Sequence, residues 1–163
     1  MGPAHFGIAL AARPIAPKAP LWVLLIAGNM LDFLCFAFMA VGIENMGVNQ
    51  ADFSHGIRIL TPPSLTWSHG LFMSLIWSVL AAVLAYLIFR DKRTSAILGS
   101  VIFSHWLLDF IVHPPYLPLF LSGSPAVGLG LWGSGPGLIF SAVLDLGLLI
   151  GGIIVYRTWR RRK

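Results

Sequence analysis

The stretch Ser104–Pro115, SHWLLDFIVHPP, places two histidines and an aspartate at four-residue intervals inside an apolar segment. In an α-helix, residues i and i+4 are neighbours on one face, so His105, Asp109 and His113 form a single polar stripe. The two prolines that follow cannot continue the helix and predict its end at His113. We expect the rest of the chain to fold around this helix and its stripe.

The composition is that of an integral membrane protein. Of 163 residues, 57% are hydrophobic and only 10% are charged, and the mean hydropathy is +0.83. A soluble domain has about 25% charged residues. The sequence therefore predicts an all-α fold, in which residues 1–163 form one membrane domain with four transmembrane helices. Each of four apolar segments is long enough, or nearly so, to cross about 30 Å of hydrocarbon: residues 21–43, 68–89, 95–113 and 135–156.

The basic residues indicate how these helices are oriented. Ten of the eleven Lys and Arg residues flank the apolar segments on the side of the N-terminus, and only Arg58 falls on the other side. Cytoplasmic flanks of membrane helices are enriched in basic residues. The bias predicts a multi-pass protein with the N-terminus and the C-terminus in the cytoplasm. Because the charge is clustered beside apolar segments, the pI of about 10 does not indicate a nucleic-acid partner.

Two further apolar segments do not fit a complete span. Residues 1–13 are good helix formers after Pro3 but are too short to cross, and Arg13 keeps their end near the cytoplasmic surface. They predict a short N-terminal half-helix that raises His5 about 12 Å above Arg13. Residues 114–134 are interrupted by proline and glycine. We expect them to form an outer loop that folds over the mouth of the bundle as a lid.

Seven ionisable side chains fall in or beside these apolar segments. An aspartate at the bilayer centre costs roughly 2.5–3.5 kcal/mol on insertion scales, so each buried carboxylate needs a partner. Helical rise places Asp32, His105 and Asp145 at similar depths, each about 15 Å from a membrane surface. Imidazole and carboxylate are ligands that suit zinc and related ions. The candidate residues are His5, Asp32, His69, His105, Asp109, His113 and Asp145. Taken singly, each histidine could instead be a hydrogen-bonded core residue, and each aspartate a structural partner or proton relay.

The order and spacing of five short motifs resemble those of the bacterial membrane-bound metal-dependent hydrolase family, which is distantly similar to zinc-dependent phospholipase C and single-strand-specific zinc nucleases. The resemblance covers most of the chain. It implies metal-binding roles for His5, Asp32, His69, His105 and Asp109, and a bacterial inner (cytoplasmic) membrane as the location. The matching pieces are AHFGIALAA, MLDF, WSHGLFMSL, SHWLLDFIVHPPYLPL and GLGLWGS.

Two functional hypotheses follow. In the first, the chain is a membrane-embedded hydrolase of a phosphoester or lipid phosphate. It uses a divalent ion, above all Zn²⁺, in the outer half of the membrane, with Asp109 or Asp145 as the general base. In the second, nothing is hydrolysed, and the same side chains bind metal or haem or move ions across the membrane. Membrane lipid is the expected surrounding in both, and the sequence makes no prediction of the oligomeric state.

Overall fold

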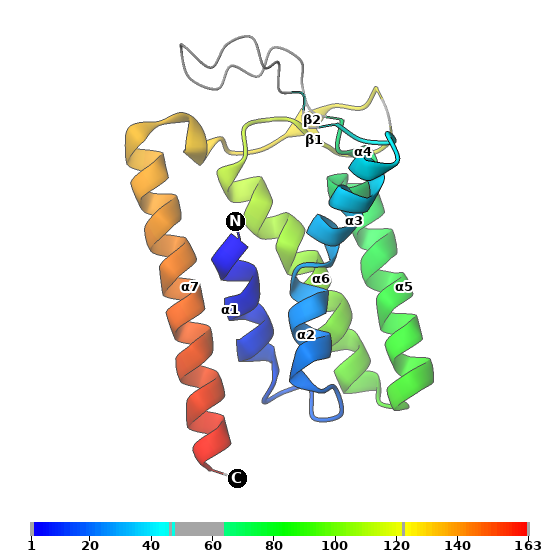
Figure 1. Cartoon of the computed structure of the whole chain (residues 1–163), viewed down its shortest axis with the longest axis vertical. Coiled ribbons are helices and arrows are strands. Elements are labelled where there is room, and N and C mark those ends of the chain that lie inside the picture. Colours follow the sequence, from blue (N-terminus) through cyan, green and yellow to red (C-terminus); the bar gives the residue numbers. More distant parts are fainter. Residues whose placement is uncertain (1, 46, 48–63, 122, 163) are drawn as a thin grey trace.

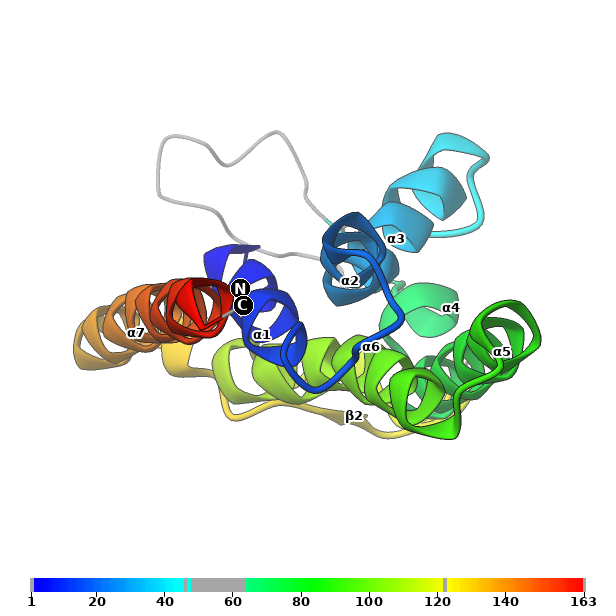
Figure 2. The same cartoon turned by 90° about the horizontal axis from the view of Figure 1, so that it is seen from below.

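The computed structural model describes residues 2–45, 47, 64–121 and 123–162, and it confirms that the chain is all-α (Figure 1). Helix α6 lies in the middle of the molecule (Figure 2), with α5 packed along one side and α1 and α2 along the other. Helix α7 packs against α1. In chain order the helices are α1 (Gly2–Ala12), α2 (Leu21–Gly28), α3 (Met30–Ala40), α4 (Thr66–His69), α5 (Leu71–Phe89), α6 (Lys92–Val112) and α7 (Gly135–Arg161).

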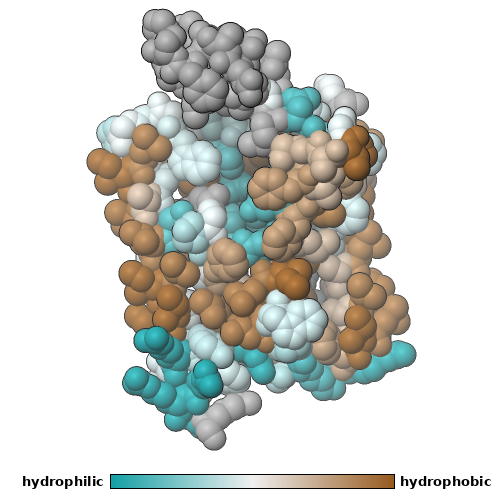
Figure 3. Space-filling model, in the orientation of Figure 1, coloured by the Kyte–Doolittle hydropathy of each residue, from teal (hydrophilic) through white to brown (hydrophobic). Residues whose placement is uncertain are grey.

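Each of the four predicted apolar segments is helical. Helices α5, α6 and α7 are each long and apolar enough to cross a membrane, and α2 and α3 together meet the same criterion as one bent span. Large apolar side chains such as Leu84 on α5 and Val143 on α7 are exposed. Figure 3 shows this apolar surface as a band above a hydrophilic lower end, where the C-terminal part of α7 lies. Arg58 lies outside the described residues.

The first span is not the single straight helix expected for residues 21–43. It breaks at Asn29, where α2 and α3 meet at an angle of 57°. Gly28 lies so close to α1 that a Cβ there would be 2.8 Å from the carbonyl oxygen of His5. The side chain of Asn29 donates a hydrogen bond back to the carbonyl oxygen of Leu25 at 2.9 Å. These two contacts lie at the break. Asp32 is on α3, so the bend sets the direction from which it approaches the other residues.

The second span also begins differently from the prediction of one helix over residues 68–89. His69 ends the one-turn helix α4, and α5 starts at Leu71 after Gly70. Only glycine fits between the two helices, because a Cβ at Gly70 would overlap the carbonyl oxygen of Thr66. His69 is therefore positioned by α4 and not by the spanning helix itself.

The third and fourth spans follow the prediction closely. Helix α6 begins at Lys92, earlier than residue 95, because the Asp91 carboxylate caps it by accepting a hydrogen bond from the Thr94 amide at 2.8 Å. The hydrogen bonds from Thr94 also lower the pKa of Asp91, which therefore stays charged at this helix end. Helix α6 ends at Val112, just before the double proline, and α7 continues past residue 156 to Arg161.

Helix α1 is the predicted half-helix. It starts at mid-height, beside α7, and descends to the lower end of the molecule (Figure 1). Its approach to α7 is very close, since a Cβ at Gly7 would overlap the backbone of Leu148, and a Cβ at Gly152 would overlap the carbonyl oxygen of Gly7. Small residues at a helix crossing allow such contact between apolar helices. The close contact fixes the height and rotation of α1, and with them the position of His5.

Residues 114–134 cross the upper end of the bundle, as expected for a lid (Figure 1). The segment contains a two-residue antiparallel ladder, β1 (Leu117–Pro118) with β2 (Ala126–Val127), and a 3-10 turn at Leu131–Gly133, both of which the all-α prediction omitted. Gly128 has a φ of +157° and lies against the backbone of His113 and Pro114. The amide of Gly130 donates to the His113 carbonyl oxygen at 2.8 Å. The lid is thus tied directly to the end of α6.

Candidate metal centre

Four of the five histidines and two aspartates converge on one buried point between the helices. They come from five places in the chain: His5 from α1, Asp32 from α3, His69 from α4, His105 and Asp109 from α6, and His113 from the C-cap position that follows α6. Six of the seven side chains predicted from the sequence are therefore brought together. Each of the four histidines directs its Nε2 atom at a carboxylate oxygen of this cluster.

Asp109 is the central residue of the cluster. Its Oδ2 lies 3.4 Å from the Nε2 atoms of both His69 and His105, and its Oδ1 lies 3.6 Å from those of both His5 and His113. The side chain is only 3% exposed. The i and i+4 spacing seen in the sequence thus puts His105 and His113 on either side of one carboxylate.

Asp32 closes the cluster on the other side. Its Oδ1 lies 3.5 Å from Nε2 of His69 and 3.5 Å from Nε2 of His105. The ligand atoms of these three residues lie within 4.8 Å of one another, and so do those of His5, His105 and Asp109. At 39%, Asp32 has by far the most exposed side chain of the six. Figure 3 shows hydrophilic side chains in a recess between the upper end of α1 and α3, the helices that carry His5 and Asp32.

The hydrogen bond to His105 defines its tautomer. Its Nδ1 lies 2.8 Å from the carbonyl oxygen of Gly28, at the end of α2. A carbonyl oxygen can only accept, so Nδ1 carries the proton and donates it. In the neutral ring Nε2 then carries a lone pair and can accept a hydrogen bond or bind a metal ion. This Nε2 is fully buried and has no hydrogen-bond partner in the part of the chain that the structure describes.

His69 is held in the same tautomer by a longer relay. The Ser68 hydroxyl donates to Oε2 of Glu44 at 2.6 Å, and the amides of Trp67 and Ser68 donate to its Oε1 at 2.7 and 2.9 Å. Because the hydroxyl proton is used on Glu44, the Ser68 oxygen accepts at 2.8 Å from Nδ1 of His69. Nε2 of His69 therefore also presents a lone pair in the neutral ring.

These tautomers create a conflict that a cation would remove. In the neutral rings, the lone pairs on Nε2 of His69 and His105 would face the oxygens of Asp32 and Asp109, which are also acceptors. The separations of 3.4 and 3.5 Å are longer than the usual 2.7–3.2 Å of an N–H···O hydrogen bond. A tetrahedral ion with ligands at about 2.0–2.1 Å holds neighbouring ligand atoms about 3.3–3.4 Å apart. The four separations between these histidines and aspartates are close to that spacing.

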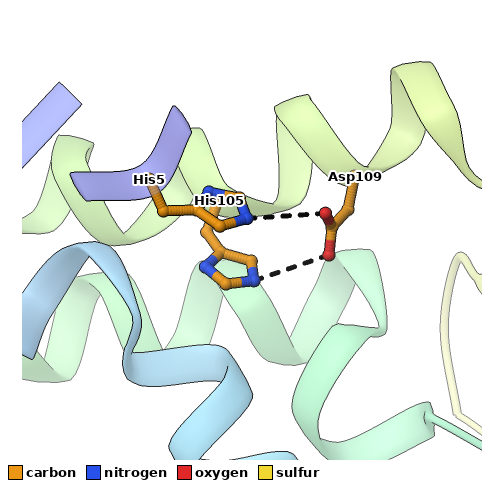
Figure 4. Close-up of side chains that lie close together, drawn as sticks. All are labelled: His5, His105 and Asp109. Atoms are coloured by element: carbon orange, nitrogen blue, oxygen red, sulfur yellow. Dashed lines mark ion pairs between the residues drawn. The ribbon is translucent and has the colours of Figure 1, made fainter. Parts of the chain in front are cut away.

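His5 completes the inner wall of the cluster. Its ring stacks on that of His105 with centroids 3.6 Å apart and planes 4° apart (Figure 4). The side chain is 1% exposed, and within the described part of the chain neither ring nitrogen has a hydrogen-bond partner. A buried imidazole with no such partner is costly. Binding a metal ion through Nε2 would offset that cost.

His113 connects the cluster to the lid. Its Nδ1 makes a short hydrogen bond with the hydroxyl of Tyr116, and its ring lies edge-on against Trp132, with centroids 4.4 Å apart. Burial, with a smaller contribution from the charge of Asp109, raises the pKa of Tyr116 to about 12, so the phenol keeps its proton at neutral pH. Two lid residues thus hold the outermost histidine in place.

Asp145, the seventh predicted residue, has a different role. Its Oδ1 accepts a hydrogen bond from the backbone amide of Ala4 at 2.9 Å. This bond holds the first turn of α1 against α7, next to His5. Among the described residues, no ion pair joins Asp145 to the histidines. The structure therefore gives the prediction of Asp145 as a general base no support, because its carboxylate is used to position α1.

The sequence analysis missed the groups that orient the histidines. Glu44 is the chain's one glutamate, it is 3% exposed, and it stands just after an apolar segment. That isolation is the only signal that could have singled it out. The carbonyl of Gly28 and the hydroxyl of Ser68 could not be found, because their roles depend on breaks in the first two spans.

Comparison of the chain with protein families, with curated proteins and with solved structures finds no match.

The Glu44–Ser68–His69 relay gives a first prediction. Replacing Ser68 by alanine removes the acceptor of the Nδ1 proton and leaves Glu44 without its hydroxyl donor. Loss of such an outer partner costs about 10–100-fold in metal affinity. We expect Ser68→Ala to weaken metal binding by that factor in a chelator competition titration. Ser78→Ala is the matched control, since the Ser78 hydroxyl donates only to the carbonyl oxygen of Ser74, at 2.7 Å. Equal affinities for Ser68→Ala and the wild type would show that the relay does not orient His69.

Proposed function

We propose that this protein is a membrane-embedded, metal-dependent hydrolase. The observation that carries the proposal is the buried cluster, in which four Nε2 atoms surround the carboxylates of Asp32 and Asp109 at 3.4–3.6 Å. Neutral histidine and carboxylate are ligands of divalent ions such as Zn²⁺. The resemblance to membrane-bound metal-dependent hydrolases supports the same conclusion from the motifs.

The proposed setting is a bacterial inner membrane. Three apolar helices and one bent pair would cross it, and ten of eleven basic residues would lie on the cytoplasmic side. The basic ends of α6 and α7 lie at the lower end of Figure 1, and His113 and the lid lie towards the upper end. In this orientation the cluster belongs to the outer half of the membrane, and its recess faces the outer leaflet.

Accessibility labelling tests the orientation. We expect a single cysteine at Lys92, in a chain whose Cys35 is replaced by serine, to react only after the cytoplasmic side is opened to a membrane-impermeant thiol reagent. A cysteine at Arg58 should react in intact cells. The reverse pattern would place the cluster in the inner half of the membrane.

The proposed reaction is hydrolysis of a phosphoester or lipid phosphate, in which water attacks phosphorus, the P–O bond to the alcohol breaks, and the alcohol takes up a proton. A zinc-type ion lowers the pKa of a bound water towards 7 and so makes a nucleophile available at neutral pH. Asp32, the most exposed residue of the cluster at 39%, is assigned as a metal ligand together with His69 and His105. Asp109, contacted by four imidazoles, is assigned as a ligand.

The geometry favours this reading over haem binding. A haem held by His69 and His113 would need an open slot between their Nε2 atoms. Instead, both atoms contact the carboxylate of Asp109, at 3.4 and 3.6 Å. A charged carboxylate there suits a small divalent ion.

A substrate screen tests the hydrolase assignment. Metal-loaded protein in detergent, offered soluble phosphoesters and lipid phosphates, should turn over at least one class. Asp32→Asn should lower the rate by about 100-fold, because an amide is a poorer metal ligand than a carboxylate and loss of even an outer partner costs about 10–100-fold in activity. Metal content should be measured in parallel, so that a slower reaction of the loaded site is distinguished from a lost ion. Absence of turnover above the Asp32→Asn background across both classes would contradict the hydrolase assignment and leave a metal-binding protein.

A further inference from the structure

Asp109 divides the cluster into two halves. Its Oδ2 faces His69 and His105, each at 3.4 Å, while its Oδ1 faces His5 and His113, each at 3.6 Å. Figure 4 shows this division for two stacked rings, since His5 and His105 point at different oxygens of the same carboxylate. The division matters because each oxygen of a carboxylate can bind a different ion.

We infer that the centre holds two metal ions bridged by the carboxylate of Asp109. This inference rests on the metal centre proposed above and specifies its stoichiometry and substrate class. A four-coordinate ion would take all four of its ligands from Asp32, His69, His105 and Oδ2 of Asp109. The groups that remain are His5, His113 and Oδ1 of Asp109. Together these three form a second ligand set.

The first position is closed. It has four protein ligands, which is the number found in structural zinc sites. Both of its histidines are fixed by hydrogen bonds from Nδ1, to Gly28 and to Ser68. Fixed ring orientation of this kind raises metal affinity. We therefore expect this ion to bind first and to resist chelators.

The second position is open. Its proposed ligands are Oδ1 of Asp109 and the two Nε2 atoms that lie 3.6 Å from it, those of His5 and His113. Three protein ligands leave one coordination place for water or substrate, as in catalytic zinc sites. Nδ1 of His5 has no hydrogen-bond partner among the described residues, so the orientation of its ring is less firmly held. His105 borders this position too, since its ligand atom lies within 4.8 Å of those of His5 and Asp109. We expect the second ion to bind more weakly than the first.

Two ions would also supply positive charge beside the cluster, where no Arg or Lys of the described residues lies. The Arg and Lys residues among the described residues lie at the cytoplasmic flanks, so none accompanies the cluster to bind a phosphate. Pairs of ions about 3.5–4 Å apart clamp both the attacking and the leaving oxygen at phosphorus. A bridged pair therefore supplies the positive charge that a phosphoester requires and that the described side chains around the cluster do not provide.

Metal counting on the full chain tests this directly. Wild-type protein in detergent, stripped by chelator and reloaded with Mn²⁺, should bind two ions per chain in two steps. Its electron paramagnetic resonance spectrum should show an exchange-coupled pair at two equivalents. A single ion at saturation would overturn the bridged pair and leave the proposed metal centre standing. No bound ion at all would overturn both.

Single-site variants test which residues form which position. We expect His113→Ala and His5→Ala each to bind one ion and lose the coupled signal, while keeping the high-affinity step. Ser104→Ala, next to His105 but bonded through its hydroxyl only to the carbonyl oxygen of Val101, should bind two. Retention of two coupled ions in both histidine variants would overturn the assignment of the second position. The wild-type count does not depend on whether either variant folds.

Discussion

Replacing Asp109 by alanine should remove the bound metal almost completely and lower the melting temperature of the purified protein. Four Nε2 atoms lie beside this one carboxylate, so its loss removes a ligand from both proposed metal positions. An ion present at a thousand times its dissociation constant contributes about 4 kcal/mol to the stability of the folded state. That amount corresponds to a melting temperature roughly 10 °C lower.

The control for Asp109→Ala is the wild type stripped of metal. If the variant is destabilised because it cannot hold an ion, chelation should lower the melting temperature of the wild type and leave that of the variant unchanged. After chelation the two should melt close together. A variant that keeps its metal, or that stays 10 °C below the stripped wild type, would show that Asp109 stabilises the fold by other contacts.

Replacing Gly152 by leucine should displace α1 from α7 and destabilise the protein by about 3 kcal/mol or more, at the upper end of the range for overpacking. A Cβ at Gly152 would overlap the backbone of Gly7, which cannot be avoided by rotating a side chain. Because α1 carries His5, the variant should also lose the ion that His5 helps to hold. Helix α6 and the ligands it carries should remain in place.

Gly151→Leu is a matched control for Gly152→Leu. The two glycines are adjacent on α7, but a Cβ at Gly151 has no atom within 4 Å among the described residues. Thermal unfolding and metal content measured in the same detergent should therefore be near those of the wild type for Gly151→Leu only. Equal effects of the two substitutions would mean that the close contact of α1 with α7 does not position His5.

The all-α fold and most of the cluster could be predicted from the sequence because they depend on short-range patterns. The i and i+4 spacing of His105, Asp109 and His113 follows from helix geometry alone, and the double proline fixes where α6 ends. The half-helix that carries His5 was predicted in the same way, from its length and from Arg13.

The details that orient the ligands could not be predicted, because they depend on contacts between distant segments. Hydropathy treats residues 21–43 as one span, yet the approach of Gly28 to α1 and the side chain of Asn29 break it and turn a carbonyl towards His105. Depth counting also grouped Asp145 with the cluster. Depth says nothing about rotation around the helix axis, and the structure turns Asp145 to the amide of Ala4.

The central claim is that the buried histidines and aspartates bind a divalent metal ion. X-ray absorption spectroscopy at the metal edge of the wild-type protein, purified from cells grown with zinc, tests it most directly. We predict a bound zinc-type ion with nitrogen and oxygen ligands at about 2.0–2.1 Å, the outer scattering of imidazole rings, and no sulfur ligand. Protein that carries no stoichiometric metal under these conditions, or whose ion has sulfur in place of imidazole ligands, would contradict the claim.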